Sequence, residues 1–142
     1  MSSKPLREFS YGGVVVRGDE VVTIRPRGRR TLALPKGGAN PDESGEQTAL
    51  REVREEAGVV ATVRGELGDV NYWYQRQGRK IYKTVRFYLC DYVSGDTADH
   101  DHEVDEASWV PLDEALQRLS FRGEREMVRR AARRLARERA DR

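Results

Sequence analysis

The sequence lacks several features that are typical of secreted or membrane proteins. Its single cysteine, Cys90, cannot form an internal disulfide, and it lies in an apolar, strand-like segment where a small buried side chain is expected rather than a nucleophile. No apolar run approaches the length of a membrane span, and the first residues lack the apolar core of a signal peptide. We therefore expect a cytoplasmic protein without a membrane partner.

Internal repeats, linkers and low-complexity segments are also absent from the 142 residues. Charged residues make up 35% of the chain and hydrophobic residues 37%, which fits a soluble globular domain. A chain of this length can bury a core of its own. The sequence therefore predicts one domain over residues 1–142, and it does not predict the oligomeric state.

Positive charge is concentrated at the C-terminal end. The net charge is +2, yet residues 122–142 carry nine arginines against four acidic residues, a local balance of +5 that leaves about −3 for the rest. Phe121, Val128, Ala132 and Leu135 recur at helical spacing and predict an amphipathic helix. Its arginines could attract nucleic acid or polyphosphate, but a solvated helix face is the simpler interpretation. A nucleic-acid partner is therefore not expected.

The most informative segment, residues 37–59, reads GGANPDESGEQTALREVREEAGV. It contains the pattern G-x5-E-x7-R-E-φ-x-E-E-x-G-φ, where φ is aliphatic, with every specified position filled. A chance match at one start point has a probability on the order of 10⁻⁹ at average residue frequencies. The nine positions are Gly37, Glu43, Arg51, Glu52, Val53, Glu55, Glu56, Gly58 and Val59.

Within this segment, residues 47–57 are predicted to form a helix. They include no glycine or proline, and Gly58 follows as a natural C-cap. An apolar stripe at helical spacing faces inward, and Glu52, Glu55 and Glu56 stand together on a neighbouring face. Three clustered carboxylates repel one another unless a cation neutralises them. Hard oxygen donors suit Mg²⁺, with Mn²⁺ as a substitute, and Mg²⁺ often bridges carboxylates to phosphates.

Taken alone, three helical glutamates would more often form a solvated acidic face. The two glycines and the spacing of Glu43 and Arg51 favour the metal site instead. The pattern is the Nudix box, and the chain resembles a Nudix hydrolase over essentially its whole length. The resemblance implies an α/β fold, the Nudix α/β/α sandwich with a central mixed β-sheet, and cleavage of nucleoside diphosphates linked to another moiety.

The resemblance also implies roles within the box. Gly37, Glu43, Arg51 and Gly58 would be structural, with Glu43 and Arg51 meeting as an ion pair. Glu52, Glu55 and Glu56 would hold Mg²⁺, joined by a carbonyl of Lys36 or Gly37. One departure is that Asn40 stands where relatives usually carry an acid and Asp42 where they carry glycine.

A second acidic cluster lies at residues 99–106, interleaved with two histidines. Alone it would be a solvated loop. The resemblance implies an additional acid six residues before the tryptophan of the last strand, and counting back from Trp109 gives Glu103 as a further metal ligand. Oxygen donors dominate Mg²⁺ sites, so the histidines are bystanders. Either Glu52 or Glu103 is expected to be the general base.

The remaining pattern predicts strands at residues 9–17, 20–25, 31–34, 59–64, 67–75, 81–92 and 108–110. Turns are expected at residues 18–19 and 77–79, and a loop at 93–105. Pro111 should open a helix that runs to residue 119.

Aromatic and basic residues flank the turn at 77–79. Strand alternation puts Tyr72 and Tyr74 on one face and Trp73 on the other, and at least one face should be core. Lys83 shares an otherwise apolar strand face, where phosphate binding and snorkelling are equally plausible. Aromatic rings can stack on a base while cations neutralise phosphates. The expected substrate-binding residues are Tyr72, Tyr74, Arg79, Lys83, Arg25 and Lys36.

The sequence thus predicts a Mg²⁺-dependent pyrophosphohydrolase acting on a small-molecule nucleoside polyphosphate. Diadenosine polyphosphates are favoured, because the LPKG entry to the box and the basic, aromatic hairpin look like that branch of the family. Oxidised nucleoside triphosphates, ADP-ribose, diphosphoinositol polyphosphates and RNA 5′ ends remain open. A non-catalytic nucleotide-binding regulator is the rival from another class, but regulators typically lose box acids and none is lost here.

Overall fold

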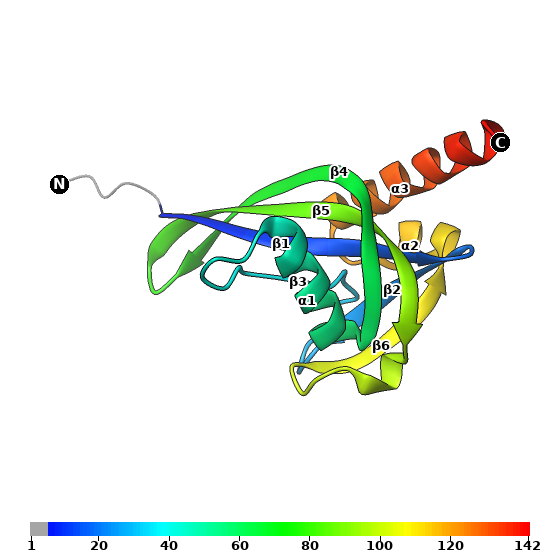
Figure 1. The fold of residues 1–142 in the computed structure, drawn as a ribbon. Coiled ribbons are helices and arrows are strands. Elements are labelled where there is room, and N and C mark those ends of the chain that lie inside the picture. Colours follow the sequence, from blue (N-terminus) through cyan, green and yellow to red (C-terminus); the bar gives the residue numbers. More distant parts are fainter. Residues whose placement is uncertain (1–5) are drawn as a thin grey trace.

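The computed structural model describes residues 6–142, so the expectation about the first residues of the chain lies partly outside it. Six strands and three α-helices alternate along this part of the chain (Figure 1). The elements are β1 (Leu6–Arg17), β2 (Glu20–Pro26), β3 (Lys36–Gly37), α1 (Gly45–Ala57), β4 (Val59–Arg76), β5 (Arg79–Gly95), the short 3-10 helix η1 (Thr97–Asp99), β6 (Val104–Pro111), α2 (Leu112–Arg118) and α3 (Arg122–Ala140).

The strands form one mixed sheet in the order β4-β5-β1-β2-β6, with β3 added beside β1. β1 and β5 run parallel, and the other pairs are antiparallel. Side chains alternate along β1: Val14 and Val16 pack with residues of α2 and α3, whereas Val15 packs with residues of α1. The sheet is therefore covered on both faces, which confirms the predicted α/β/α sandwich.

Coverage on both faces explains the continuous apolar run in β1. Val14, Val15 and Val16 are all buried, as expected for a central strand with a helix layer on each side. Cys90 lies directly beside Val15 in β5 and is buried as well. Its structural role is therefore confirmed. None of the helices in residues 6–142 is long and apolar enough to cross a membrane.

The predicted strand at residues 31–34 is wrong. Only Ala33 pairs with a strand, through an isolated bridge to Ile24, and the strand that leads into the box is the two-residue β3. The reason is that Leu32 exchanges hydrogen bonds with Ser120 instead of with a neighbouring strand. Strand pairing in this part of the chain is replaced by contacts to side chains.

The hairpin of β4 and β5 is longer than predicted. The two expected stretches at 59–64 and 67–75 form the single strand β4, whose register shifts between Val63 and Gly65 and between Glu66 and Gly68. The predicted loop at 93–105 is shorter, because β5 continues to Gly95 and β6 begins at Val104. The turn at Gln77 and Gly78 is confirmed, with positive φ at both residues as in a type I′ turn.

Candidate active site

Helix α1 is fixed at both ends by local hydrogen bonds. The Ser44 side chain accepts a hydrogen bond from the Gln47 backbone N–H (3.1 Å), and the Gln47 side chain accepts one from the Ser44 N–H (2.9 Å). Gly58 ends the helix with φ of 77°, and a side chain there would collide with the Asp96 carbonyl. The buried residues of the helix include Ala49, Val53 and Ala57. This orientation leaves the box glutamates on the side that faces β3.

Arg51 joins the loop before α1 to the helix. Its Nε lies 2.8 Å from Glu43 Oε2, its Nη2 lies 3.0 Å from Glu43 Oε1, and Nη2 also donates to the Gly38 carbonyl at 2.8 Å. The hydrogen bonds from Arg51 lower the pKa of Glu43 to about 2, so Glu43 is an anion throughout the neutral range. The structure brings this pair together across the loop, as the family resemblance implied.

The loop itself accommodates the two residues that depart from the family pattern. Asp42 has φ of 64°, in the left-handed region, at the position where relatives usually carry glycine. The Asn40 backbone N–H donates to Glu43 Oε1 at 3.0 Å, and its carbonyl accepts from the Glu43 N–H at 3.1 Å. The loop is therefore closed on Glu43 without an acidic side chain at position 40.

Glu52 lies against the backbone of Gly37. A Cβ at Gly37 would be 2.5 Å from each Glu52 carboxylate oxygen, so only glycine permits this approach. Arg51 Nη1 lies 2.6 Å from Glu52 Oε1 and 3.2 Å from Glu55 Oε2. Burial raises the pKa of Glu52, and the negative charges of Glu55 and Glu103 add to this effect against the opposing effect of Arg51.

Glu56 is the most enclosed acid of the box. Its Oε1 accepts a hydrogen bond from the Lys36 backbone N–H at 2.7 Å. Burial raises the pKa of Glu56 to about 8, and the charge of Glu52 one helical turn away contributes to the shift. Within residues 6–142, Glu56 forms no ion pair with a lysine or arginine.

The donor set fits a hard divalent cation. No three His, Cys, Asp or Glu side chains of the described chain converge closely enough to form a metal cluster, and Arg51 instead pairs with Glu52 and Glu55. However, burial raises the pKa of both Glu52 and Glu56, and the negative charge of Glu52 raises the pKa of Glu56 further, which is the electrostatic situation that a bound cation relieves.

Glu103 approaches the box from the other side, on the turn that precedes β6. The turn is tied to α1 because the Asp101 backbone N–H donates to the Glu55 carbonyl at 2.8 Å. Glu103 donates its N–H to Asp101 Oδ1 (3.0 Å), and its carbonyl accepts from the Arg27 N–H (2.9 Å). The structure thus places Glu103 near enough to influence Glu52 electrostatically. The His100 ring pairs with the Asp101 carbonyl at 2.8 Å.

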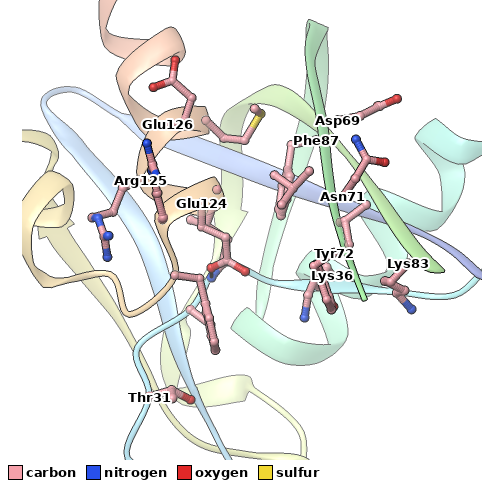
Figure 2. A pocket seen from close by; sticks show the side chains of 18 of the residues that line it. Thr31, Lys36, Asp69, Asn71, Tyr72, Lys83, Phe87, Glu124, Arg125 and Glu126 are labelled. Atoms are coloured by element: carbon pink, nitrogen blue, oxygen red, sulfur yellow. Dashed lines mark hydrogen bonds between the residues drawn. The ribbon is translucent and has the colours of Figure 1, made fainter. Parts of the chain in front are cut away.

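A pocket of about 1420 Å³ begins at the box and extends between the sheet and α3 (Figure 2). Four of the predicted substrate-binding residues line it. They are Lys36, Tyr72, Tyr74 and Lys83. Arg25 and Arg79 do not line it: the Arg25 guanidinium donates to the Arg30 carbonyl and pairs with Glu106 at 3.8 Å, and Arg79 lies at the hairpin turn.

The hairpin wall of the pocket is only partly enclosed. Tyr72 and Tyr74 share the pocket face with ring centroids 6.2 Å apart, and the Tyr74 hydroxyl donates to Glu8. Trp73 lies on the opposite face against Tyr82 and is 55% exposed, so the expectation that one face of this segment is core is wrong. The reason is that this end of the hairpin extends beyond the helix layers (Figure 1). Burial lowers the pKa of Lys83, the half-buried cation of the pocket.

The sequence analysis missed the wall that α3 contributes. Glu124 lines the pocket, together with arginines that were interpreted as a solvated face. The pocket-lining arginines of α3 are Arg122, Arg125, Arg129 and Arg130. The hydrophobic period of α3 predicted its buried stripe, but it could not show which polar residues next to that stripe face a cavity.

Comparisons with known proteins show which family the chain belongs to. The NUDIX domain family matches residues 7–138. The chain is 37% identical over 135 residues to the MutT4 protein of Mycobacterium tuberculosis (strain CDC 1551 / Oshkosh), covering 88% of this chain and 54% of the relative. The 8-oxo-(d)GTP phosphatase of Mycolicibacterium smegmatis (strain ATCC 700084 / mc(2)155) is 32% identical over 116 residues, covering 81% and 34%.

Among solved structures, a C. elegans Ap4A hydrolase binary complex has a similar fold, with a TM-score of 0.71, 23% identity and coverage of 91% of this chain and 98% of that chain. The chain belongs to the Nudix family, whose hydrolases generally use divalent metal ions such as Mg²⁺. It spans about half the length of the mycobacterial MutT4 protein.

Proposed function

We propose that the protein is a Mg²⁺-dependent pyrophosphohydrolase that cleaves a phosphoanhydride bond of a nucleoside polyphosphate, with Mn²⁺ able to replace Mg²⁺. One observation carries the proposal: Glu56 of the box and Lys36 line the same pocket as Tyr72 and Lys83. A phosphate chain at the box would therefore be continuous with a space that offers an aromatic ring and cations for the rest of the substrate.

Glu52, Glu55 and Glu56, with a carbonyl of Lys36 or Gly37, would hold the cation. When bound, it would neutralise the non-bridging phosphate oxygens and the leaving phosphate. Lys36 and Lys83 would orient the phosphate chain by charge.

A water molecule would attack one phosphorus in line, forming a new P–O bond while the bridging P–O bond breaks. Its proton would pass to a carboxylate, for which Glu52 and Glu103 are the two candidates. Glu52 belongs to the box on α1, and Glu103, on the turn before β6, is close enough for its charge to raise the pKa of Glu52. If Glu103 serves as the base, Glu52 would remain a ligand.

Diadenosine polyphosphates are the first candidate substrates. The pocket exceeds the roughly 300–1,000 Å³ of common small-molecule sites, which suits an extended ligand. Two tyrosines on its hairpin wall could stack on a purine. An oxidised nucleoside triphosphate is the second candidate, because the Mycolicibacterium smegmatis relative is named as an 8-oxo-(d)GTP phosphatase.

A substrate panel tests the proposal. Phosphate or pyrophosphate release would be measured with Mg²⁺ for diadenosine polyphosphates, canonical and oxidised nucleoside triphosphates, ADP-ribose, diphosphoinositol polyphosphates and 5′-triphosphate RNA. We expect turnover that a Glu55→Gln variant abolishes. Tight nucleotide binding without turnover of any panel member would instead indicate a regulator.

A further inference from the structure

Glu124 lies in the first turn of α3 and lines the pocket at its α3 wall. Its side chain points from α3 into the space that also contains the Lys36 side chain (Figure 2). The residue is only 4% exposed, so this carboxyl group is far more enclosed than acids on helix surfaces usually are.

The hydrogen bonding of Glu124 is incomplete. Its Oε1 accepts a hydrogen bond from the Leu34 backbone N–H at 2.7 Å. Within residues 6–142, the Leu34 N–H makes the one hydrogen bond to this carboxylate, and no lysine or arginine forms an ion pair with it. Glu126, two residues further along, shows the contrast: its carboxylate pairs with Arg129 (2.6 Å) and Arg130 (3.5 Å).

A buried carboxyl group without a cation is costly for the fold, and burial raises the pKa of Glu124 to about 7. A Leu34 N–H needs only one acceptor oxygen, so the second oxygen is not required for structure. The same pocket is lined by Thr31, whose buried hydroxyl has no hydrogen-bond partner in the described chain.

The charges of the pocket restrict what Glu124 can bind. A cationic ligand would be repelled by Lys36, Lys83, Arg122 and Arg125, which line the pocket and form no ion pair in the described chain. A phosphate would be repelled by the carboxylate itself. A neutral group that donates a hydrogen bond satisfies both conditions. Phe121 also lines the pocket and is exposed, so it supplies apolar surface for a flat ring.

A nucleobase combines these properties. When the phosphates lie at the box, the base is the neutral, flat end of a nucleotide. Adenine and guanine each carry an exocyclic amino group that donates a hydrogen bond. We propose that Glu124 accepts a hydrogen bond from the exocyclic amino group of the substrate's nucleobase, and that it selects amino-bearing bases over bases that lack this group.

The inference rests on the proposed function only for its kinetic readout. The test compares kcat/KM for two substrate pairs at pH 8: guanosine against inosine triphosphate, which differ only by the 2-amino group, and adenosine against inosine triphosphate, which tests the 6-amino group. We expect a preference of about 10- to 100-fold for the amino-bearing partner in at least one pair, as for a hydrogen bond to a charged acceptor. The pair that shows it identifies the amino group.

Glu124→Gln is the informative variant. Its amide oxygen can still accept from the Leu34 N–H, while its NH₂ group replaces the free oxygen and faces the amino group as a second donor. We expect the preference to fall to within about threefold. If Glu124 only held α3 in place, the substitution would change kcat/KM equally for both substrates of a pair. The matched control, Glu126→Gln, removes an acid from the same helix and should keep the wild-type preference.

Binding of guanosine, adenosine and inosine diphosphates by calorimetry, without added metal, separates the two proposals. Selective binding of the amino-bearing nucleotides in this assay, combined with no turnover of any substrate in the panel with Mg²⁺, would sustain the role of Glu124 and refute the proposed function. Equal kcat/KM within both pairs for the wild-type protein would overturn the role of Glu124 and leave the hydrolase intact. An unchanged preference in Glu124→Gln would overturn it as well.

Discussion

Gly37→Ala should abolish most of the activity, whereas Gly38→Ala should leave it intact. A Cβ at Gly37 would stand 2.5 Å from both carboxylate oxygens of Glu52, where ordinary van der Waals contact begins at 3.4 Å. The Glu52 carboxyl group would have to move by roughly 1 Å. A misplacement of about 1 Å in a catalytic group can lower the rate about 100-fold. A Cβ at Gly38 meets no heavy atom within 4 Å.

Gly37 ends β3 and Gly38 follows it directly, and neither has the positive φ that would itself strain an alanine. The comparison therefore isolates the collision with Glu52. We expect kcat with Mg²⁺ to fall about 100-fold for Gly37→Ala and less than twofold for Gly38→Ala. Crowding costs about 1–3 kcal/mol of folding stability at most, because Glu52 can swing toward solvent. Thermal melts would verify that both variants fold.

Two results would refute this reasoning. If Gly37→Ala retained more than about a tenth of the wild-type kcat, the position of Glu52 against Gly37 would not matter for the reaction. If both alanine variants lost activity equally, the loop would need backbone freedom rather than room for Glu52.

Four further predictions concern the site. Glu55→Gln should lower kcat by more than tenfold with Mg²⁺ while the melting temperature stays nearly level, because its partly exposed pairing with Arg51 contributes little stability. Tyr72→Ala should raise KM, because the loss of a base stack costs about 1–3 kcal/mol of binding free energy. An unchanged KM would assign the ring to structure alone. Glu103→Gln should lower kcat at least tenfold while Asp99→Asn has almost no effect, and equal small losses would leave Glu52 as the base. The pKa of Glu124 is raised by burial from 4.5 to about 7, so the unfolded chain loses this proton at lower pH than the folded protein does. Its contribution to stability is therefore complete below about pH 4.5 and is lost as the pH rises to about 7, by about 3 kcal/mol. Denaturant titrations from pH 4.5 to 8 should show Glu124→Gln gaining stability relative to wild type over this window, and a constant difference would contradict the burial effect.

The box and its helix could be predicted from the sequence because their determinants are local. Ser44 and Gln47 cap the start of α1, Gly58 ends it, and helical spacing alone orders Glu52 and Glu56 on one side. The helix begins two residues earlier than predicted, since the capping box lies before the apolar stripe. The mixed sheet followed from the family resemblance rather than from periodicity.

The pocket could not be predicted in the same way. Arg25 was expected to bind substrate, yet strand alternation directs it to Glu106, whereas its neighbours Ile24 and Pro26 line the pocket. Glu124 is separated from the box by more than 60 residues, and its helix reaches the pocket only through tertiary packing. A sequence pattern records which face of a helix is apolar, but not which cavity its remaining residues line.

One extended segment, residues 32–37, connects the two ends of the pocket. Along it, alternate backbone N–H groups point to the same side, as the period of an extended chain requires. Leu32 donates to the Ser120 hydroxyl, Leu34 to Glu124 and Lys36 to Glu56, at 2.7–2.8 Å in each case. The acceptors are side chains from the linker before α3, from α3 and from α1.

This arrangement explains why the predicted strand at residues 31–34 did not form, since side chains take the place of a partner strand. It also links Glu124 and Glu56 through one backbone segment. Glu124 at the far wall and Glu56 at the box hold donors only two residues apart, so a shift of this segment by one residue would displace both. If the proposed base contact at Glu124 forms, the backbone of Leu34, Pro35 and Lys36 would hold that base at a fixed position relative to phosphates at the box. Under the proposed function, the length of this segment would then set which phosphoanhydride bond of a bound nucleotide meets the acids of α1.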